Sequence, residues 1–118
     1  MSEEATLDQL RAAVAAFRDE RDWSQFHSPK NLAIAIAVEA AELLELYLWR
    51  QETDELDEGE LTRTRQEMAD VLIFLLSMAD ALDVDLAAEV NRKLAENARK
   101  YPSDIVRGSA RKYTEYQP

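Results

Sequence analysis

The sequence predicts an all-α fold for a single domain of 118 residues. Only two glycines and three prolines interrupt it, and 47 % apolar with 32 % charged residues is a globular rather than a disordered composition. Helix-starting and helix-ending signals divide the chain into four apolar or amphipathic stretches. We expect a four-helix, bundle-like core over about 7–101 and an irregular tail over 103–118.

The first predicted helix runs from about Leu7 to Arg21. It follows Thr6, and Gln9 stands three positions after that threonine, which is the capping-box pattern of a helix start. Helical spacing gives this segment one apolar stripe, formed by Leu7, Leu10, Val14 and Phe17.

A short loop of polar and aromatic residues, 22–28, precedes the second predicted helix. Ser28 is a preferred N-cap residue, and Pro29 suits the first helical position because the N–H that proline lacks would be unpaired there. The apolar sequence that follows predicts a helix to about Gln51. The acidic stretch 53–60, which contains the glycine at position 59, is expected to be the next loop.

The third predicted helix spans about 61–82, and the fourth spans about 86–101. The acidic segment 83–85 separates them by ending one helix and capping the next. The fourth helix ends at Tyr101 because Pro102 disfavours helical backbone at the residue before it. One face of this helix carries Leu86, Val90 and Leu94.

Two pairs of carboxylates interrupt apolar sequence. Glu39 and Glu42 lie in the run 32–49, and Glu67 and Asp70 open the next apolar run. The members of each pair are three residues apart and therefore share one helical face. Because desolvating an ionised carboxylate is costly, such residues are seldom buried unless they are paired or bound to a metal. The four carboxylates predict a site for a hard cation such as Mg²⁺, with Mn²⁺ as the alternative.

Simple geometry supports a shared site. In an antiparallel hairpin of the second and third helices, a rise of about 1.5 Å per residue places both pairs roughly 10–18 Å from the turn, and helix axes pack about 8–10 Å apart. Acidic pairs are also common on solvated helix faces, and Glu45 suits that role better because it is rotated further around the helix. A di-iron site would use Glu-x-x-His pairs, whereas the one histidine, His27, lies in a loop.

A second group of candidates is aromatic and basic. The loop before the second helix and the end of that helix carry Trp23, Phe26, His27 and Trp49. Aromatic faces can stack on a nucleobase, although a single tryptophan more often packs in a core. One face of the fourth helix carries Lys93, Asn97 and Lys100. That face is ordinarily solvated, but beside a bound metal it would hold phosphates.

Charge and composition exclude several classes. The formal net charge of −10 disfavours DNA or RNA as a partner, because phosphates would be repelled. The chain has no cysteine and therefore no disulfide framework or thiolate chemistry. The first ten residues lack the basic and apolar regions of a signal peptide, and three glutamates within 32–49 argue against a membrane span. We expect a cytoplasmic protein that does not associate with membranes.

The acidic pairs also carry a family resemblance. Glu39-Ala-Ala-Glu42 and Glu67-Met-Ala-Asp70 resemble the signature of the all-α nucleoside triphosphate pyrophosphohydrolases, the MazG-like superfamily. The segments around them are similar to the dCTP pyrophosphatase branch, and the resemblance extends from about residue 7 to residue 113. These segments are 20–32, Trp49, 100–102 and 107–113.

The resemblance implies hydrolysis of a nucleoside triphosphate, most closely dCTP or a modified dCTP, to the monophosphate and pyrophosphate. It implies that the four carboxylates bind Mg²⁺ and are the catalytic residues. It assigns to the base and sugar Trp23, Ser24, Gln25, Phe26, His27, Trp49 and Phe74. It assigns to the phosphates Lys93, Asn97, Lys100 and Tyr101. Val14 and Phe74 replace a histidine and a tyrosine of the branch and so remove two hydrogen-bonding groups.

Several alternatives stay open at this stage. Without a serine triad or a cysteine nucleophile, direct attack by water is the natural mechanism, with a carboxylate as the base. The rival enzymes are a broad house-cleaning triphosphate pyrophosphatase and a dUTP pyrophosphatase, and the rival without catalysis is an acidic helical interaction module. Because the second and third helices are apolar around most of their circumference, we expect a homo-oligomer. The resemblance implies a tetramer built as a pair of dimers.

Overall fold

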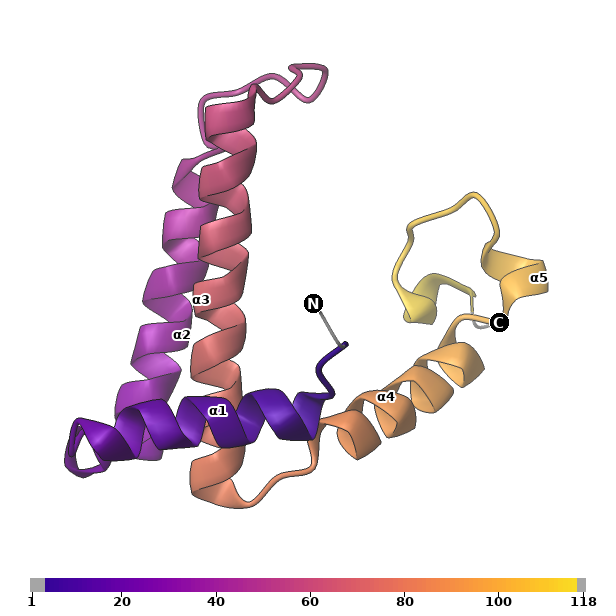
Figure 1. The fold of residues 1–118 in the computed structure, drawn as a ribbon. Coiled ribbons are helices and arrows are strands. Elements are labelled where there is room, and N and C mark those ends of the chain that lie inside the picture. The colour runs from indigo at the N-terminus through magenta and orange to yellow at the C-terminus, as the bar shows by residue number, and fades with distance from the viewer. Residues whose placement is uncertain (1–3, 117–118) are drawn as a thin grey trace. The chain divides into compact units, whose positions relative to one another are not determined.

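The computed structural model describes residues 4–116, and every secondary-structure element within that range is a helix (Figure 1). The α-helices are α1 (Leu7–Glu20), α2 (Pro29–Glu45), α3 (Glu58–Leu82), α4 (Leu86–Lys100) and α5 (Ser103–Val106). Two short 3₁₀ helices are η1 (Ser24–Phe26) and η2 (Tyr113–Tyr116). The predicted all-α fold is confirmed. Residues 1–3, which belong to the segment predicted to lack signal-peptide features, lie outside the described range. Residues 117–118, at the end of the predicted irregular tail, lie outside it as well.

The chain forms two compact units, one ending at Val84 and the other beginning at Asp85. The first contains α1, η1, α2 and α3, and the second contains α4, α5 and η2. Each unit is described by itself below, and a single domain over the whole chain stays a prediction.

The helix starts lie where the local signals predict them. At α1, the Gln9 amide donates to Thr6 Oγ1 at 3.1 Å and the Thr6 amide donates to Gln9 Oε1 at 2.9 Å, which completes the capping box. At α2, Ser28 Oγ accepts from the Asn31 amide at 3.2 Å, and Pro29 occupies the first helical position. These short side chains fix the starts because they satisfy N–H groups that the helix leaves unpaired.

The connection between α2 and α3 differs from the prediction. Helix α2 ends at Glu45 rather than near Gln51, because the next amides bond to carbonyls three residues back and turn the chain. Helix α3 starts at Glu58, because Asp57 forms a capping box with Glu60. Consequently Gly59 belongs to the first turn of α3 and not to the loop.

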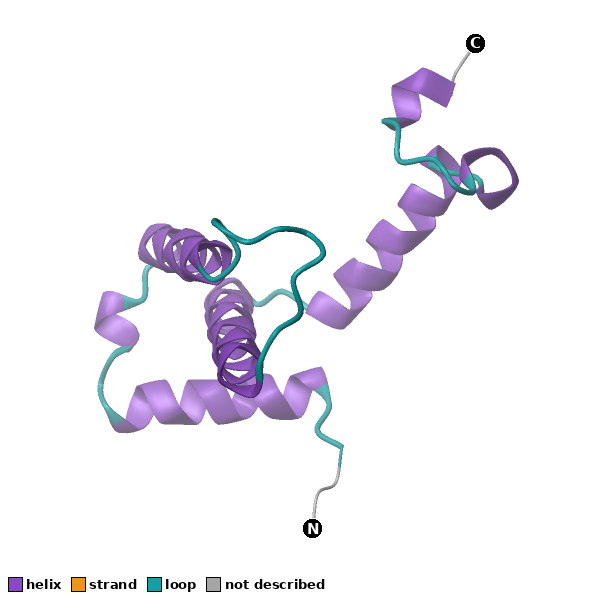
Figure 2. Ribbon diagram, turned by 90° about the horizontal axis from the view of Figure 1, so that it is seen from above, coloured by secondary structure: helices purple, strands orange, loops and turns teal. Residues whose placement is uncertain are grey.

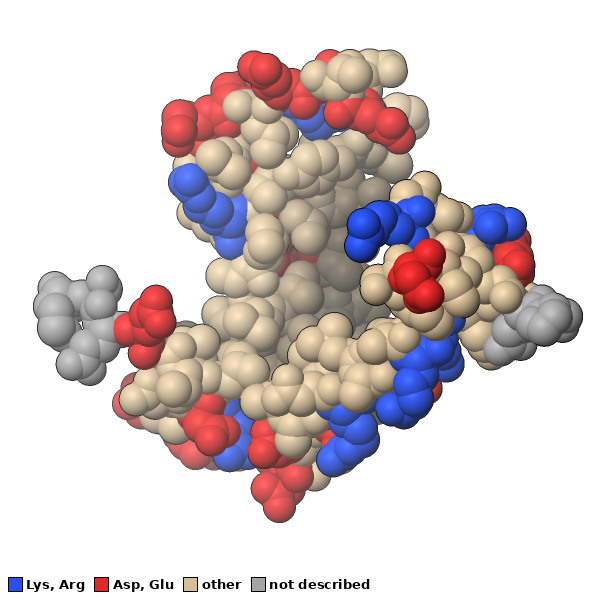
Figure 3. All heavy atoms as spheres, turned by 90° about the vertical axis from the view of Figure 1, so that its right-hand side faces the viewer, with Lys and Arg blue, Asp and Glu red and all other residues tan. Residues whose placement is uncertain are grey.

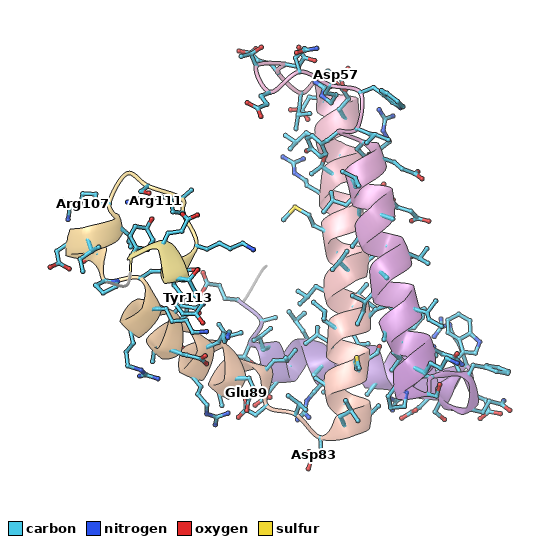
Figure 4. All side chains as sticks on the ribbon, turned by 180° about the vertical axis from the view of Figure 1, so that it is seen from behind. Asp57, Asp83, Glu89, Arg107, Arg111 and Tyr113 are labelled. Carbon is cyan, nitrogen blue, oxygen red and sulfur yellow. The ribbon has the colours of Figure 1, made fainter. Side chains whose placement is uncertain are left out.

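The break after α3 is local and agrees with the prediction. Asp83 adopts a left-handed conformation with φ of 53°, and the Val84 amide donates to the Ala79 carbonyl at 2.8 Å. Asp85 then caps α4 by accepting from the Ala88 amide at 3.1 Å. Figure 4 labels Asp57 and Asp83 at the two ends of α3.

In the first unit, α2 and α3 form an antiparallel hairpin and α1 crosses its base (Figures 1 and 2). Arg18 on α1 donates from Nη1 to Asp80 Oδ2 on α3 at 2.9 Å. The core is small: among the described residues, the buried apolar side chains are Leu32, Leu76 and Ala79. No described helix combines the length and the apolar character needed to cross a bilayer.

Large apolar side chains cover the outside of the hairpin. Five of these side chains are each more than half exposed to solvent: Ile34, Leu44, Leu48, Trp49 and Met68. Figure 3 shows a mostly uncharged surface on one face of the molecule, with acidic residues gathered above it. The expectation that these helices are apolar around much of their surface therefore agrees with the structure.

In the second unit, the tail is folded rather than irregular as predicted. The Tyr113 amide donates to the Tyr101 hydroxyl at 3.3 Å, and the rings of Tyr101 and Tyr113 meet edge to face at 6.2 Å. The Lys100 ammonium lies 4.9 Å from the Tyr113 ring centre. Figure 4 labels Arg111 and Tyr113 in this segment. Aromatic contacts between residues twelve apart, which no local pattern reveals, hold the tail on the end of α4.

Candidate metal and nucleotide site

Three carboxylates meet between α2 and α3. Glu39 comes from α2, and Glu67 and Asp70 come from α3. Each offers one oxygen, and these oxygens all lie within 4.8 Å of one another. In the antiparallel hairpin, Glu39 on α2 lies at the same height as Glu67 and Asp70 on α3. Because the two α3 carboxylates are three residues apart, both point toward α2. We call these residues the carboxylate cluster.

The cluster is electrostatically unfavourable without a cation. Burial, the interactions with Glu42, the charge of Asp70 and the contact with Glu67 together raise the pKa of Glu39 to about 7. Burial also raises the pKa of Glu67, and the charge of Glu42 adds to this effect. The Oε2 atoms of Glu39 and Glu67 are buried and have no hydrogen-bond partner within the described part of the chain. Unpaired, partly buried carboxylate oxygens fit a hard divalent cation, which prefers oxygen ligands.

Glu42 lies beside the cluster rather than within it. Its side chain is exposed, and its oxygens are outside the group that meets within 4.8 Å. Nevertheless, it is close enough to raise the pKa of both Glu39 and Glu67. Glu45 is exposed as well, in agreement with its expected place on the solvated face.

A pocket of about 140 Å³ lies between α1, the loop after it and α3. Its walls are mostly apolar, and its lining consists of Val14, Phe17, Arg18, Trp23, His27, Ile73, Phe74 and Ser77. Phe74 is one helical turn after Asp70, so the pocket lies next to the carboxylate cluster along α3. We call it the α1–α3 pocket.

The aromatic residues predicted for base binding divide into two groups. Trp23 and His27 line the α1–α3 pocket, where Trp23 packs edge to face on Phe17 at 5.8 Å. His27 Nδ1 is buried and has no hydrogen-bond partner among the described residues. It is therefore a polar group available to a ligand in a mostly apolar pocket.

The other predicted base contacts lie elsewhere. Ser24, Gln25 and Phe26 form the exposed η1, and Gln25 Nε2 donates to the Asp22 carbonyl at 2.9 Å. Trp49 lies beyond the end of α2 and is 90 % exposed. None of these four side chains lines the α1–α3 pocket, and their roles stay predictions.

The predicted phosphate-binding residues belong to the second unit. Lys93 and Lys100 both reach the Glu96 carboxylate on α4, at 3.5 and 3.2 Å. Tyr101 packs against the rings of Tyr113 and Tyr116 in the tail. Lys93, Asn97 and Lys100 share one face of α4, as their spacing predicts, and a phosphate role stays a prediction.

Sequence reasoning missed several residues that line the α1–α3 pocket. Arg18, Ile73 and Ser77 have no motif that marks them, since they meet only because α1 crosses α3. Arg18 also accepts, through its carbonyl, the Trp23 amide at 3.1 Å, which fixes the start of the aromatic loop.

A helical hairpin with a carboxylate cluster beside an apolar, aromatic pocket defines a class of candidate metal- and nucleotide-binding proteins. Comparison with known proteins identifies the family within that class. The MazG-like family model matches residues 34–116, and the chain belongs to this family.

Individual relatives agree with the family assignment. Human dCTP pyrophosphatase 1 is 42 % identical over 97 % of this chain and 69 % of the relative, and the mouse protein of the same name is 41 % identical over the same shares. The crystal structure of a pyrophosphatase from Archaeoglobus fulgidus has a TM-score of 0.77 and 38 % identity, covering 86 % of this chain and 97 % of that one. The predicted MazG-like membership and fold are confirmed.

Proposed function

We propose that the protein hydrolyses dCTP, or a modified dCTP, to the nucleoside monophosphate and pyrophosphate. It is thus a nucleoside triphosphate pyrophosphohydrolase. The observation that carries the proposal is the carboxylate cluster, with buried unpaired oxygens on Glu39 and Glu67 next to the α1–α3 pocket. The relatives named dCTP pyrophosphatase 1 support the choice of substrate.

The chemistry of the donors supports Mg²⁺, with Mn²⁺ as the alternative. Glu39, Glu67 and Asp70 would hold the cation, and Glu42, which the family resemblance also assigns to the metal, would be the fourth ligand. All four supply oxygen, which suits these hard ions better than zinc or copper. When bound, such an ion neutralises phosphate charge and stabilises the negative charge that develops in the transition state.

The residues of the chain have separate tasks in this reaction. A carboxylate of the cluster accepts a proton from the water that attacks phosphorus, and pyrophosphate leaves as the α–β phosphoanhydride breaks. Trp23 and Phe74 offer ring faces to the base, and His27 Nδ1 offers a polar contact. The apolar walls of the pocket exclude water from that end of the substrate.

A broader or dUTP-directed activity is the second candidate. Val14 and Phe74 line the pocket and offer the base edge no hydrogen bond, which leaves His27 as its unpaired polar group. A site with few hydrogen bonds to the base discriminates weakly among bases.

We further propose that the protein acts as a homo-oligomer, as a tetramer made of two dimers. Ile34, Leu44 and Met68 are each more than half exposed on the hairpin, and Trp49 is 90 % exposed. Exposed apolar side chains in this number usually lie in an interface. In such an assembly a neighbouring copy would supply part of each pocket. A cytoplasmic location and a lack of nucleic-acid or membrane partners stay predictions.

The deciding experiment measures pyrophosphate release from a panel of triphosphates. We expect dCTP to yield dCMP and pyrophosphate with Mg²⁺, and no product in EDTA. Glu45→Gln is the matched control because Glu45 is exposed outside the cluster, and it should leave turnover unchanged. If no triphosphate is cleaved with Mg²⁺ or Mn²⁺, the acidic interaction module becomes the better explanation.

A further inference from the structure

The loop between α2 and α3 contains a large aromatic side chain that is exposed to solvent. The loop itself is held to α3 by side-chain contacts. Trp49 is 90 % exposed, yet Tyr47, two residues before it, and Arg50, the next residue, have partners on α3. An indole in this position gains little from its own chain. Packing in the core of its own chain therefore does not explain a tryptophan at this position.

Arg50, the next residue, is the centre of this bracing. Its Nη1 forms an ion pair with Glu60 Oε2, and its Nη2 donates to the Glu55 carbonyl at 2.8 Å. Its amide donates to the Tyr47 carbonyl at 3.1 Å. The side chains of Arg50 and Glu60 are only 20 % and 26 % exposed, so this pair is screened less than a surface pair.

Glu60 connects the ion pair to the start of α3. Its second oxygen, Oε1, accepts from the Asp57 amide at 3.0 Å, which is half of the capping box. One turn further, Thr64 Oγ1 lies 2.8 Å from the Tyr47 hydroxyl. Tyr47 and Arg50 are thus attached to successive turns of one helix, and Trp49 lies between them.

Arg50 is poorly placed to bind a phosphate itself. Its guanidinium is already engaged by Glu60 and by the Glu55 carbonyl. It also lines a shallow pocket of about 340 Å³ to which Glu52 and Asp54 contribute, and these carboxylates would repel an anion.

We propose that Arg50, through its ion pair with Glu60, is a positioning residue that holds Trp49 ready to stack on the nucleobase. This inference rests on the proposed function and on a base contact by Trp49. A pre-positioned ring loses less conformational freedom when the nucleotide binds, and this gain lowers KM. The argument holds whether the stacked nucleotide is bound by the same chain or by a neighbouring copy.

The test compares Arg50→Met, Glu60→Gln and Trp49→Ala in the full-length enzyme with dCTP and Mg²⁺. Glu60→Gln is informative because glutamine can still accept the Asp57 amide, whereas its NH₂ group cannot accept from Arg50. Arg11→Met is the matched control, since among residues 4–116 the ion-pair partner of Arg11 is Asp8 on its own helix.

Trp49→Ala should raise KM roughly 5-fold or more, as expected for a lost base stack. Arg50→Met and Glu60→Gln should raise KM by about 3- to 10-fold with kcat within a factor of about two, because the reacting groups are untouched. When either is combined with Trp49→Ala, KM should rise no further, since the residue being positioned is gone. Arg11→Met should leave KM unchanged.

Three results would overturn the inference. The first is an unchanged KM in Arg50→Met and Glu60→Gln, and the second is an additive rise in KM when they are combined with Trp49→Ala. The third is a normal KM in Trp49→Ala, which removes the base contact while hydrolysis itself stands. A wild-type enzyme that cleaves no triphosphate would instead refute the proposed function.

Discussion

Replacing Glu39 by glutamine should stabilise the metal-free protein at pH 8. Glutamine has nearly the shape of glutamate but carries no charge. In the cluster the charge of Glu39 is opposed by burial and by Glu42, Asp70 and Glu67, and these raise its pKa from 4.5 to about 7. Because the pKa in the folded state is above the ordinary value, the charged form is what folding disfavours.

The pH dependence follows from that shift. Below about pH 4.5 Glu39 is protonated in both the folded and unfolded states, and its favourable contribution is fully present; it is lost as the pH rises through about 7. If Glu39 alone carried the shift, the loss would be roughly 3 kcal/mol. Partial exposure and sharing of charge reduce this, so we expect Glu39→Gln to gain about 1–2 kcal/mol at pH 8.

The assay is urea unfolding followed by circular dichroism, in EDTA, from pH 5 to pH 8 at fixed ionic strength and protein concentration. The gain in the free energy of unfolding should be near zero at pH 5 and grow toward pH 8. Adding Mg²⁺ should reverse the order, because wild type has one more ligand for the cation. Glu45→Gln serves as the control and should show neither trend.

The reasoning is refuted if Glu39→Gln destabilises the metal-free protein at pH 8. It is also refuted if the gain is independent of pH, since repulsion within the cluster would then not be its cause.

Three further predictions concern the site, the α1–α3 contact and assembly. Asp70→Asn should reduce kcat by at least about 100-fold with an unchanged circular dichroism spectrum, and near-normal turnover would remove Asp70 from the site. Asp80→Asn should lower the free energy of unfolding in urea by about 1–3 kcal/mol, because it leaves Arg18, only 14 % exposed, without its partner on α3. The control Asp8→Asn, at an exposed surface pair, should lower it by less than about 0.5 kcal/mol. Light scattering during size exclusion should give a mass near four chains, and a stable, active species near 13.5 kDa would contradict the predicted assembly.

The parts of the fold that the sequence predicts correctly depend on neighbours within a few residues. Thr6, Ser28 and Asp85 cap their helices as their local patterns predict. The predicted end of α2, near Gln51, was wrong because the apolar sequence pattern continues to Trp49 although the helix ends at Glu45. The turn there depends on contacts between Tyr47 and Thr64, seventeen residues apart, which no window of helical periodicity contains.

The same distinction between local and long-range contacts applies to the candidate site. Spacing of three residues within one helix predicted that Glu67 and Asp70 would share a face, and the hairpin geometry predicted that Glu39 would lie opposite. The pocket could be predicted only in part. Arg18 and Ser77 reach it because α1 crosses α3, and that crossing depends on tertiary packing rather than on a sequence motif.

The small core of the first unit has a consequence for how the protein is made. Leu32, Leu76 and Ala79 are the buried apolar side chains among the described residues, and so few cannot offset the conformational entropy lost when the hairpin orders. In the proposed oligomer, most of the stabilising burial would come from the interfaces between copies. Folding and association would then be one equilibrium, governed by mass action, and dilution alone should lower the unfolding midpoint. A newly synthesised chain would reach its full stability only after it meets a second one.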